Sequence, residues 1–362
     1  MQVLQGPPRS PARFDGIRLA RHGRMRIAIT GATGNLGTSV IEALCEDSSV
    51  SEIVGLSRRL PKASFSRTQF VQADVAETDL VPFFSGMDLV IHLAWQIQPS
   101  HSGEGLERTN IVGSSRVFDA VATARVPGLL YASSVGAYSP APKSRLCDES
   151  WPTGGIATAL YSRHKSRVER ILDDFEARHP RVRVVRMRPA LVFKQAAATG
   201  IRRLFLGPLV PRFLVGDRPR FVPQHPDLRF QAVHSLDVGR AFKAAAQSDV
   251  RGPFNLAADP ILDADSMSRA FGAKKITVSR NTLRTLTAIA WRLHLQCSEP
   301  GWVDLCFESP LMSTERAQKL LGWQPERTSL EALAELLRGM RQGAGIETPP
   351  LAPPFKTSEA RR

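Results

Sequence analysis

Residues 25–37 read Met25-Arg-Ile-Ala-Ile-Thr-Gly31-Ala-Thr-Gly34-Asn-Leu-Gly37, which joins a strand pattern directly to a glycine-rich turn. Residues 38–45 then follow with the pattern of a helix. Between a strand and a helix, the three glycines permit a tight turn, close approach of the backbone to a pyrophosphate, and close packing of the helix on the strand. Elsewhere this glycine spacing is a weak signal, but here it predicts a dinucleotide site at the helix N-terminus.

The rest of the chain shows the rhythm of a parallel sheet covered by helices. Apolar runs such as 88–94 and 182–187 alternate with helical stretches, and from about residue 263 helical patterns dominate, at 281–295, 313–321 and 329–341. We therefore predict an α/β fold, a Rossmann-type doubly wound parallel sheet with a smaller, mainly helical C-terminal substrate-binding region. The expected divisions are a disordered basic extension (1–24), an NAD(P)-binding Rossmann domain (25–189), a substrate-binding lid and C-terminal region interleaved with the sheet through a strand near 228–233 (190–342), and a Pro-rich tail (343–362).

Composition bounds the class of protein. The 362 residues are 43% hydrophobic, which is enough for a large core without disulfides. The four cysteines show no C-x-x-C spacing, so we expect reduced thiols and no metal site. No apolar run approaches the roughly 18 residues of a membrane span. We expect a cytoplasmic protein with no membrane partner.

Net charge is the one compositional feature that points to an anionic partner. The chain has 48 Lys and Arg against 34 Asp and Glu, a net charge of +14. Such an excess attracts phosphates non-specifically. Residues 1–24 alone hold five arginines against one aspartate, which weakens any link between the charge and the folded part. We therefore expect no specific nucleic-acid partner.

The end of the second predicted strand bears on the cofactor. About twenty residues after the glycines stand Ser57, Arg58 and Arg59, with no carboxylate to accept hydrogen bonds from a ribose 2′-hydroxyl. Their side chains suit a 2′-phosphate through charge-assisted hydrogen bonds. This favours NADP, with NAD as the alternative; the other interpretation of the arginines is a solvated strand end.

Tyr161 and Lys165 are the candidate proton-transfer pair. Four residues apart in a helical stretch, they share one helix face. A phenol with a pKa of about 10 is a poor base at neutral pH, but a neighbouring ammonium and a positive nicotinamide would stabilise the phenolate. Ser133 and Ser134 end a predicted strand, where loops gather around a ligand, and a hydroxyl there can bind a substrate carbonyl. Tyr-x-x-x-Lys alone is more often a solvated helix face, but with these serines and the glycine loop it predicts a catalytic site.

This ordered series resembles the extended short-chain dehydrogenase/reductase family, the NAD-dependent epimerase/dehydratases, over roughly residues 25–340. The motifs that carry the resemblance, besides the glycine loop and Tyr161 with Lys165, are Asp74-Val75, His92-Leu93-Ala94, Asn110-Ile-Val-Gly-Ser114, Ser134 with Tyr138, Arg188-Pro189, Val233-His234-Ser-Leu-Asp237-Val and the segment 313–325.

The resemblance implies a mechanism and a set of site residues. A hydride would pass between a substrate carbon and the nicotinamide, Tyr161 would exchange the proton, Lys165 would hold the nicotinamide ribose and lower the tyrosine pKa, and Ser134 would polarise the carbonyl. Ser134 is preferred over Ser133 because the family's catalytic hydroxyl precedes the tyrosine matching Tyr138 by four positions. The expected cofactor-binding residues are Gly31, Thr33, Gly34, Asn35, Leu36, Gly37, Ser57, Arg58, Arg59, Asp74, Val75, Leu93, Ala94, Trp95, Asn110, Tyr161, Lys165 and Pro189. His92 and Asp237 are expected to be structural.

The chain departs from the nucleotide-sugar members of that family. Where they carry a Val-Tyr-Gly-Pro-like run, this chain has Ala190-Leu-Val-Phe-Lys194, and Phe230 replaces the arginine four residues before His234. Trp95 replaces a small residue, which would narrow the pocket floor. Residues 190–229 hold seven basic residues against two acidic ones. They indicate either an anionic substrate held by arginines or a solvated basic surface.

Three functions remain at this point. The preferred hypothesis is an NAD(P)-dependent oxidoreductase acting on a carbonyl or alcohol. The alternatives are a nucleotide-sugar epimerase or dehydratase that retains its cofactor, and a cofactor-sensing binding protein. Relatives commonly form homodimers through helices that match residues near 103–125 and 160–179, so a homodimer is the assembly that the resemblance implies.

Overall fold

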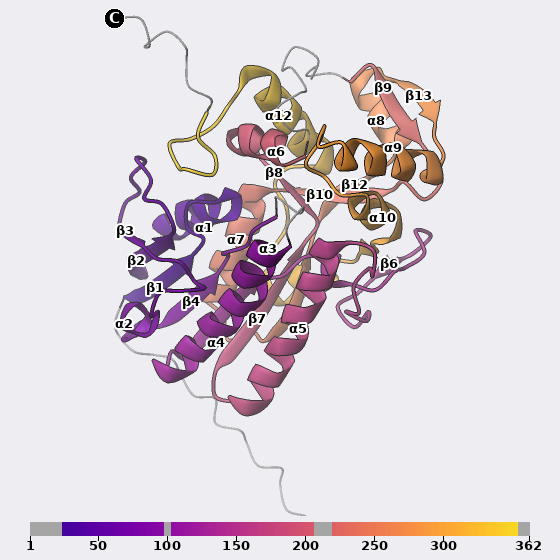
Figure 1. Cartoon of the computed structure of the whole chain (residues 1–362). Coiled ribbons are helices and arrows are strands. Elements are labelled where there is room, and N and C mark those ends of the chain that lie inside the picture. The colour runs from indigo at the N-terminus through magenta and orange to yellow at the C-terminus, as the bar shows by residue number, and fades with distance from the viewer. Residues whose placement is uncertain (1–23, 98–102, 206–218, 354–362) are drawn as a thin grey trace, which may run out of the picture.

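Seven parallel strands form the central sheet, in the order β11-β7-β5-β4-β1-β2-β3 (Figure 1). The computed structural model describes residues 24–97, 103–205 and 219–353. The strands of this sheet are β1 (Met25–Thr30), β2 (Val50–Ser57), β3 (Thr68–Gln72), β4 (Leu89–His92), β5 (Gly128–Ala132), β7 (Arg183–Pro189) and β11 (Gly252–Leu256). β1 is central, and the chain runs first to one side of it and then to the other. The order therefore reverses beside β1, where open parallel sheets bind their ligands.

Helices cover both faces of the sheet and give it two apolar cores. Ile27 and Ile29 face one layer, Ala28 and Val90 the other. The first layer is formed by α1 (Asn35–Cys45) and α7 (Ser235–Ala246), and the second by α2 (Val81–Phe84), α4 (Gly113–Thr123) and α5 (Leu160–Arg178). Because both faces are covered, β4 and β5 are buried along their whole length. The predicted fold is confirmed.

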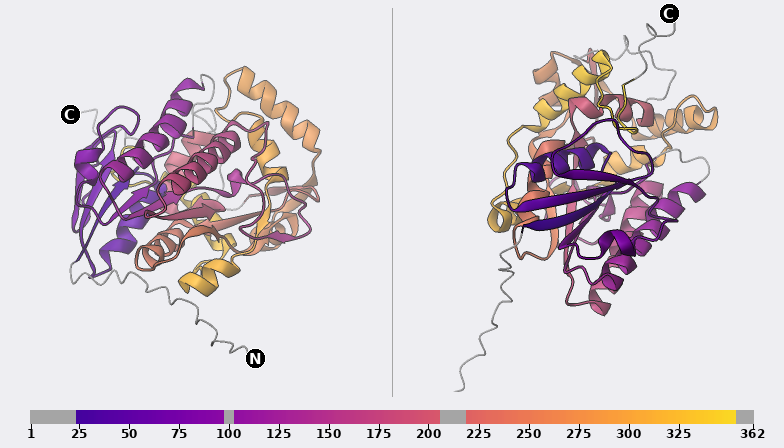
Figure 2. Two further views of the ribbon diagram at one scale, coloured as in Figure 1. Left: turned by 90° about the horizontal axis from the view of Figure 1, so that it is seen from below. Right: turned by 90° about the vertical axis from the view of Figure 1, so that its left-hand side faces the viewer.

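The C-terminal region stands at the C-terminal edge of the main sheet and carries three small sheets, β12-β10-β8, β13-β9 and β14-β6 (Figures 1 and 2). Their strands are β6 (Leu146–Cys147), β8 (Leu191–Phe193), β9 (Phe221–Gln224), β10 (Phe230–His234), β12 (Ala258–Leu262), β13 (Lys274–Thr277) and β14 (Leu311–Met312). The remaining helices are α3 (Glu104–Glu107), α6 (Ala198–Phe205), α8 (Ala264–Phe271), α9 (Arg280–Arg292), α10 (Gly301–Glu308), α11 (Glu315–Leu321) and α12 (Ser329–Gln342), with short turns η1 (Arg108–Val112), η2 (Val135–Ala137) and η3 (Gln195–Ala197).

The strand expected near 228–233 is present as β10, but it does not enter the main sheet. It pairs with β8 and with β12. Strand β8 comes directly after β7 in the chain, at the point where the chain has left the main sheet. The C-terminal segment that does enter the main sheet is β11, which pairs with β7. The helices expected at 281–295, 313–321 and 329–341 are α9, α11 and α12.

The described part of the Pro-rich tail packs back on the body without a helix. The Lys62 and Ala63 amides donate to the Glu347 carbonyl, and Leu351 is buried.

Residues 1–23, which hold most of the basic extension, lie outside the described residues. All four cysteines are free thiols. Within the described ranges, no helix combines the length and the apolar character needed to cross a bilayer.

Lys194 ties the C-terminal region to the first helix. It follows β8, and its ammonium donates to Thr38 Oγ1 at 2.7 Å and to Ser39 Oγ at 2.8 Å. The side chain is only 7% exposed. Burial lowers the Lys194 pKa to about 8, although Glu42 opposes the shift. The buried ammonium therefore has two neutral hydroxyls as partners and no carboxylate within hydrogen-bond distance among the described residues. Burying this charge lowers the free energy of unfolding.

Lys194→Met is expected to raise the free energy of unfolding at pH 7 by about 1–3 kcal/mol, because the stem is kept and the buried charge is removed. The unfolded lysine keeps its proton up to its ordinary pKa of 10.5, whereas the folded one loses it near 8. Wild-type stability therefore rises with pH across that window, and the advantage of methionine shrinks. Urea unfolding at pH 7 and pH 10 measures both; Lys319→Met, at an exposed site, is the control. The same difference at the two pH values would contradict this account.

Candidate active site

The glycine loop has the geometry of a phosphate cradle. Gly31 has φ +70°, and a Cβ there would lie 2.6 Å from the Ala94 backbone nitrogen. A Cβ on Gly37 would lie 2.4 Å from the Gly31 carbonyl oxygen, so helix α1 can pack this closely only on a glycine. At Gly34 the nearest neighbour would be 3.4 Å away, and among the described residues no side chain caps the first turn of α1. The backbone at Gly34 and the amides after it can therefore approach a pyrophosphate.

Two buried polar atoms beside this cradle support the fit of a ligand. Within the described residues, Asn35 Oδ1 and Trp95 Nε1 have no hydrogen-bond partner. Both residues were predicted to bind the cofactor. An unpaired buried donor or acceptor costs about 1–3 kcal/mol, and a bound ligand that pairs with these two atoms would remove that cost. The residues present therefore fit a dinucleotide.

The end of β2, where the adenosine ribose of a dinucleotide is expected, carries two arginines. β2 ends at Ser57, whose hydroxyl donates to the Arg59 carbonyl at 2.9 Å. Arg58 and Arg59 are exposed, and Arg58 Nη1 lies 3.5 Å from the Gln96 side-chain oxygen. Ser57 thus shapes the turn, and the two guanidinium groups lie where a 2′-phosphate could meet them.

Asp74, Val75 and Asn110 shape the walls around the cradle. The Asp74 carboxylate accepts from the Ala76 amide at 2.9 Å, and Val75 is buried against Gly113. Asn110 accepts from the Gln96 amide and donates to the Gln96 carbonyl, both at 2.8 Å. It therefore fixes the backbone that follows Leu93, Ala94 and Trp95 after β4. Pro189 ends β7 at the same edge of the sheet.

Ser134 and Tyr161 are brought together as predicted. Tyr161 lies in the first turn of α5, and its ring packs on Gly136 beside the Ser134 hydroxyl. Ser134 accepts from the Gly136 amide at 3.0 Å, which fixes its side chain. Burial raises the Tyr161 pKa to about 12, although the neighbouring Ser134 hydroxyl lowers it. Ser133 instead donates to Glu169, so the structure places Ser134 and not Ser133 at the phenol.

Lys165 lies one turn after Tyr161 but is occupied by other groups. Its ammonium donates to the Ala132 carbonyl at 2.7 Å and to the Tyr131 hydroxyl at 3.4 Å. The ring centroid of Trp95 is 3.5 Å away, that of Tyr161 6.0 Å. Burial holds the Lys165 pKa well below its usual range, although Glu169 raises it. The expected lowering of the Tyr161 pKa is not seen here, because burial dominates at both groups.

Glu169, which the sequence analysis did not single out, positions the helix of the candidate catalytic pair. It is fully buried on α5 and binds Arg188 through two hydrogen bonds of 2.9 Å and Arg186 at 3.0 Å. Although burial opposes ionisation, these partners lower the Glu169 pKa to about 2. Its position four residues after Lys165, on the same helix face, was the signal that could have found it.

His92 and Asp237 are structural, as expected. His92 is fully buried between Thr30, at 2.7 Å, and Ser114, at 2.9 Å, and burial lowers its pKa to about 3. It is therefore neutral and holds β4 to α4. Asp237 is fully buried, pairs with Arg240 and accepts from the Glu326 amide.

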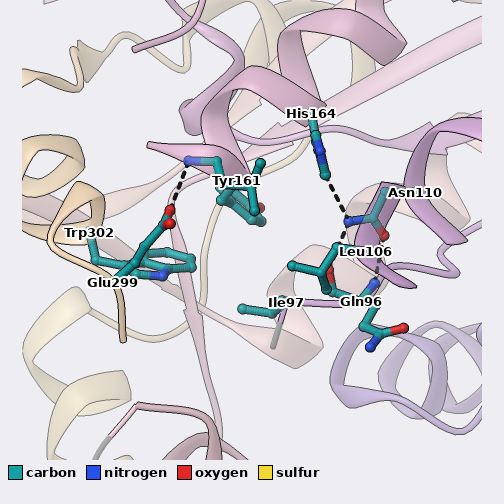
Figure 3. A pocket seen from close by; sticks show the side chains of 9 residues that line it. Gln96, Ile97, Leu106, Asn110, Tyr161, His164, Glu299 and Trp302 are labelled. Atoms are coloured by element: carbon teal, nitrogen blue, oxygen red, sulfur yellow. Dashed lines mark hydrogen bonds between the residues drawn. The ribbon is translucent and has the colours of Figure 1, made fainter. Parts of the chain in front are cut away.

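A small cavity beside the phenol is lined in part by Trp302 and Glu299, which the sequence analysis did not single out. Figure 3 shows Trp302 and Glu299 on one side of Tyr161 and Asn110 on the other. The rings of Tyr161 and Trp302 are 5.1 Å apart, and Glu299 accepts from the Leu160 amide at 2.8 Å. Burial raises the Glu299 pKa. The cavity among them is about 10 Å³, room for one water molecule, so a substrate requires these walls to part.

The described basic residues of 190–229 do not line this cavity. Lys194 binds the α1 hydroxyls, Arg203 donates to the Pro350 carbonyl at 2.7 Å, and Arg229 donates to the Lys143 carbonyl at 2.9 Å. Arg212 and Arg218 lie outside the described residues. An anionic substrate therefore stays a prediction without support from these three side chains.

A scan against family models matches residues 27–257 to the NAD dependent epimerase/dehydratase family. The chain belongs to this family. The model spans the glycine loop, the Tyr161 site and every strand of the main sheet. The family resemblance and the α/β fold inferred from the sequence are confirmed.

Individual relatives are more distant. An uncharacterised protein of Mycobacterium tuberculosis is 24% identical over 325 residues, which cover 86% of this chain and 83% of that protein. The L-arabinose 1-dehydrogenase (NAD(P)(+)) of Haloferax volcanii is 34% identical over 110 residues, 30% of this chain and 41% of that enzyme. A crystal structure of UDP-glucuronic acid 4-epimerase from Bacillus cereus, in complex with UDP-glucuronic acid and NAD, matches with a TM-score of 0.63 at 17% identity, covering 88% of this chain and 99% of that one. At that identity the likeness shows the fold alone.

Trp95 is expected to move when a cofactor binds, because Lys165 can reach a ribose hydroxyl only after the indole leaves its ammonium. Addition of NADP to the wild type should then change the tryptophan fluorescence, and Trp95→Phe should remove most of the change. Trp151→Phe, at a tryptophan outside the site, should retain it. If Trp95→Phe responds like the wild type at saturating NADP, Trp95 does not move.

Proposed function

We propose that this chain is an NAD(P)-dependent oxidoreductase that transfers a hydride to or from a carbonyl or alcohol substrate, with Tyr161 as the proton donor or acceptor. The observation that carries the proposal is that the Tyr161 ring and the Ser134 hydroxyl meet beside Gly136, with Lys165 one helical turn away and the glycine cradle at the same sheet edge. A bound nicotinamide would supply or accept the hydride.

The chain's own residues have distinct tasks in this reaction. Tyr161 Oη exchanges a proton with the substrate oxygen, and Ser134 Oγ donates a hydrogen bond to that oxygen. With a pKa of about 12, the phenol is a proton donor rather than a base until a positive charge approaches it. Lys165 is that charge once Trp95 has left its ammonium. The indoles of Trp95 and Trp302 then keep water from the reacting oxygen.

The substrate wall favours a compact substrate with hydroxyl groups. Trp302 offers an apolar face, and Glu299 offers a carboxylate that accepts hydrogen bonds. A carboxylate in this wall repels a diphosphate. This arrangement supports a small carbonyl or alcohol over a nucleotide-linked sugar.

A second candidate is a nucleotide-sugar epimerase or dehydratase that retains its cofactor. Its support is the fold likeness to UDP-sugar epimerases and a local similarity, 26% over 177 residues, to the UDP-glucose 4-epimerase of Neisseria meningitidis. A net change at the reduced-nicotinamide absorbance band supports the oxidoreductase, and product without that change supports the epimerase. A cofactor-sensing binding protein would not need Tyr161 and Lys165 together.

Tyr161→Phe is expected to lower turnover by at least about 100-fold, because it removes the proton donor. Cofactor affinity, measured by calorimetry, and melting temperature should stay near the wild-type values. The rate of alcohol oxidation by the wild type should rise with pH as the phenol ionises, and the variant should lack this rise. Full turnover in the variant with normal cofactor binding would overturn the proposed proton transfer.

The preference for NADP is tested at the end of β2. Arg58→Ala with Arg59→Ala should weaken NADP binding about tenfold or more, because charge-assisted hydrogen bonds to the 2′-phosphate are lost. NAD binding should be unchanged, and Arg269→Ala, at an exposed arginine on α8, is the control. Tighter binding of NAD than of NADP by the wild type would make the interpretation of Ser57 to Arg59 wrong.

A further inference from the structure

Helix α9 presents an apolar stripe to solvent. Leu286, Ile289 and Leu293 follow at three- and four-residue spacing and so share one face, and their exposed fractions are 59%, 50% and 63%. Leu295 continues the stripe at 49%. Figure 2 shows α9 at the rim of the molecule in both views. No residue of α9 is buried.

Two arginines on the half-buried face of α9 attach the helix to the body of the protein. Arg280 and Arg284 form ion pairs with Asp304 of α10, and Arg280 also pairs with Glu308. A surface helix of a globular protein normally buries its apolar stripe and exposes its charges. The half-buried face of α9 carries Leu283, Ala288 and Trp291 beside the arginines. Leu286, Ile289 and Leu293, however, stay on the exposed face. This exposed apolar stripe is available to a partner.

Large exposed apolar side chains concentrate in this part of the molecule. Among the described residues with marked exposure, six of ten fall between residues 221 and 295. They are Phe221, Ile276, Leu286, Ile289, Leu293 and Leu295. Scattered single exposures need no explanation, but a concentration of this kind marks an interaction surface.

The charge around α9 selects the partner. Residues 264–308 hold six Lys and Arg against four Asp and Glu, and the whole chain has a net charge of +14. Asp304 and Glu308 are paired with Arg280 and Arg284, whereas Arg292 is exposed beside the stripe. Two copies of a chain with this net positive charge repel each other, which disfavours a homodimer through this face. An anionic lipid surface has acyl chains that can surround the apolar side chains and negatively charged headgroups that attract the basic ones.

We propose that α9 docks the protein on an anionic lipid surface, with Leu286, Ile289 and Leu293 inserted and Arg292 among the headgroups. A helix that lies in the surface needs no membrane-spanning run. α9 packs on α10, which carries Trp302. Docking would therefore bring the substrate side of the candidate site close to the lipid. This inference is independent of the proposed reaction.

Vesicle co-sedimentation of the full chain tests the proposal. The wild type should bind phosphatidylcholine vesicles that contain phosphatidylglycerol and bind pure phosphatidylcholine more weakly. Leu286→Gln with Ile289→Gln should weaken binding about tenfold or more, because two inserted side chains are lost. The matched control is Leu146→Gln with Leu320→Gln, at positions 54% and 50% exposed elsewhere, which should bind like the wild type.

Three outcomes overturn the proposal. One is equal binding by the α9 variant and the wild type, which would mean that basic residues elsewhere cause the binding. Another is a wild-type dimer in light scattering that the α9 variant abolishes, with no vesicle binding by either. The third is a lower melting temperature of the α9 variant without any vesicle binding, which would mean that another part of the chain covers the stripe.

Discussion

The buried carboxylate of Glu169 is the interaction on which the candidate site depends. It joins helix α5 to strand β7 through Arg186 and Arg188, and to the end of β5 through Ser133. A carboxylate with no exposure is stable only with such partners, and breaking a buried pair of this kind typically costs about 3–5 kcal/mol. The network fixes the height and rotation of α5, so that Tyr161 meets Ser134 and Lys165 faces Ala132.

A second constraint acts at the candidate catalytic pair itself. Trp95 and Trp302 remove water from around the phenol and the ammonium, and burial raises the Tyr161 pKa and lowers the Lys165 pKa. The site without ligands is thus stable with a neutral phenol. Charge on the phenol becomes favourable only when a positive group approaches Tyr161, which links proton transfer to the loaded state.

The C-terminal region contributes to the site in two ways. Lys194 anchors β8 to α1 beside the glycine cradle, and α10 brings Trp302 to the phenol. The same region leaves the apolar face of α9 uncovered while its arginines hold α10. Site and surface are therefore connected through one pair of packed helices.

The sequence by itself determined the α/β fold, the glycine cradle, the pairing of Ser134 with Tyr161, and the structural roles of His92 and Asp237. These features depend on local periodicity, on backbone room at glycine, or on motifs of ordered spacing, all of which are readable along the chain. Only the tertiary structure decided that Trp302 and Glu299 line the cavity beside Tyr161, that Trp95 covers Lys165, and that β11 rather than β10 joins the main sheet. Those contacts join segments far apart in sequence, and their energies come from burial and packing, which no local pattern records.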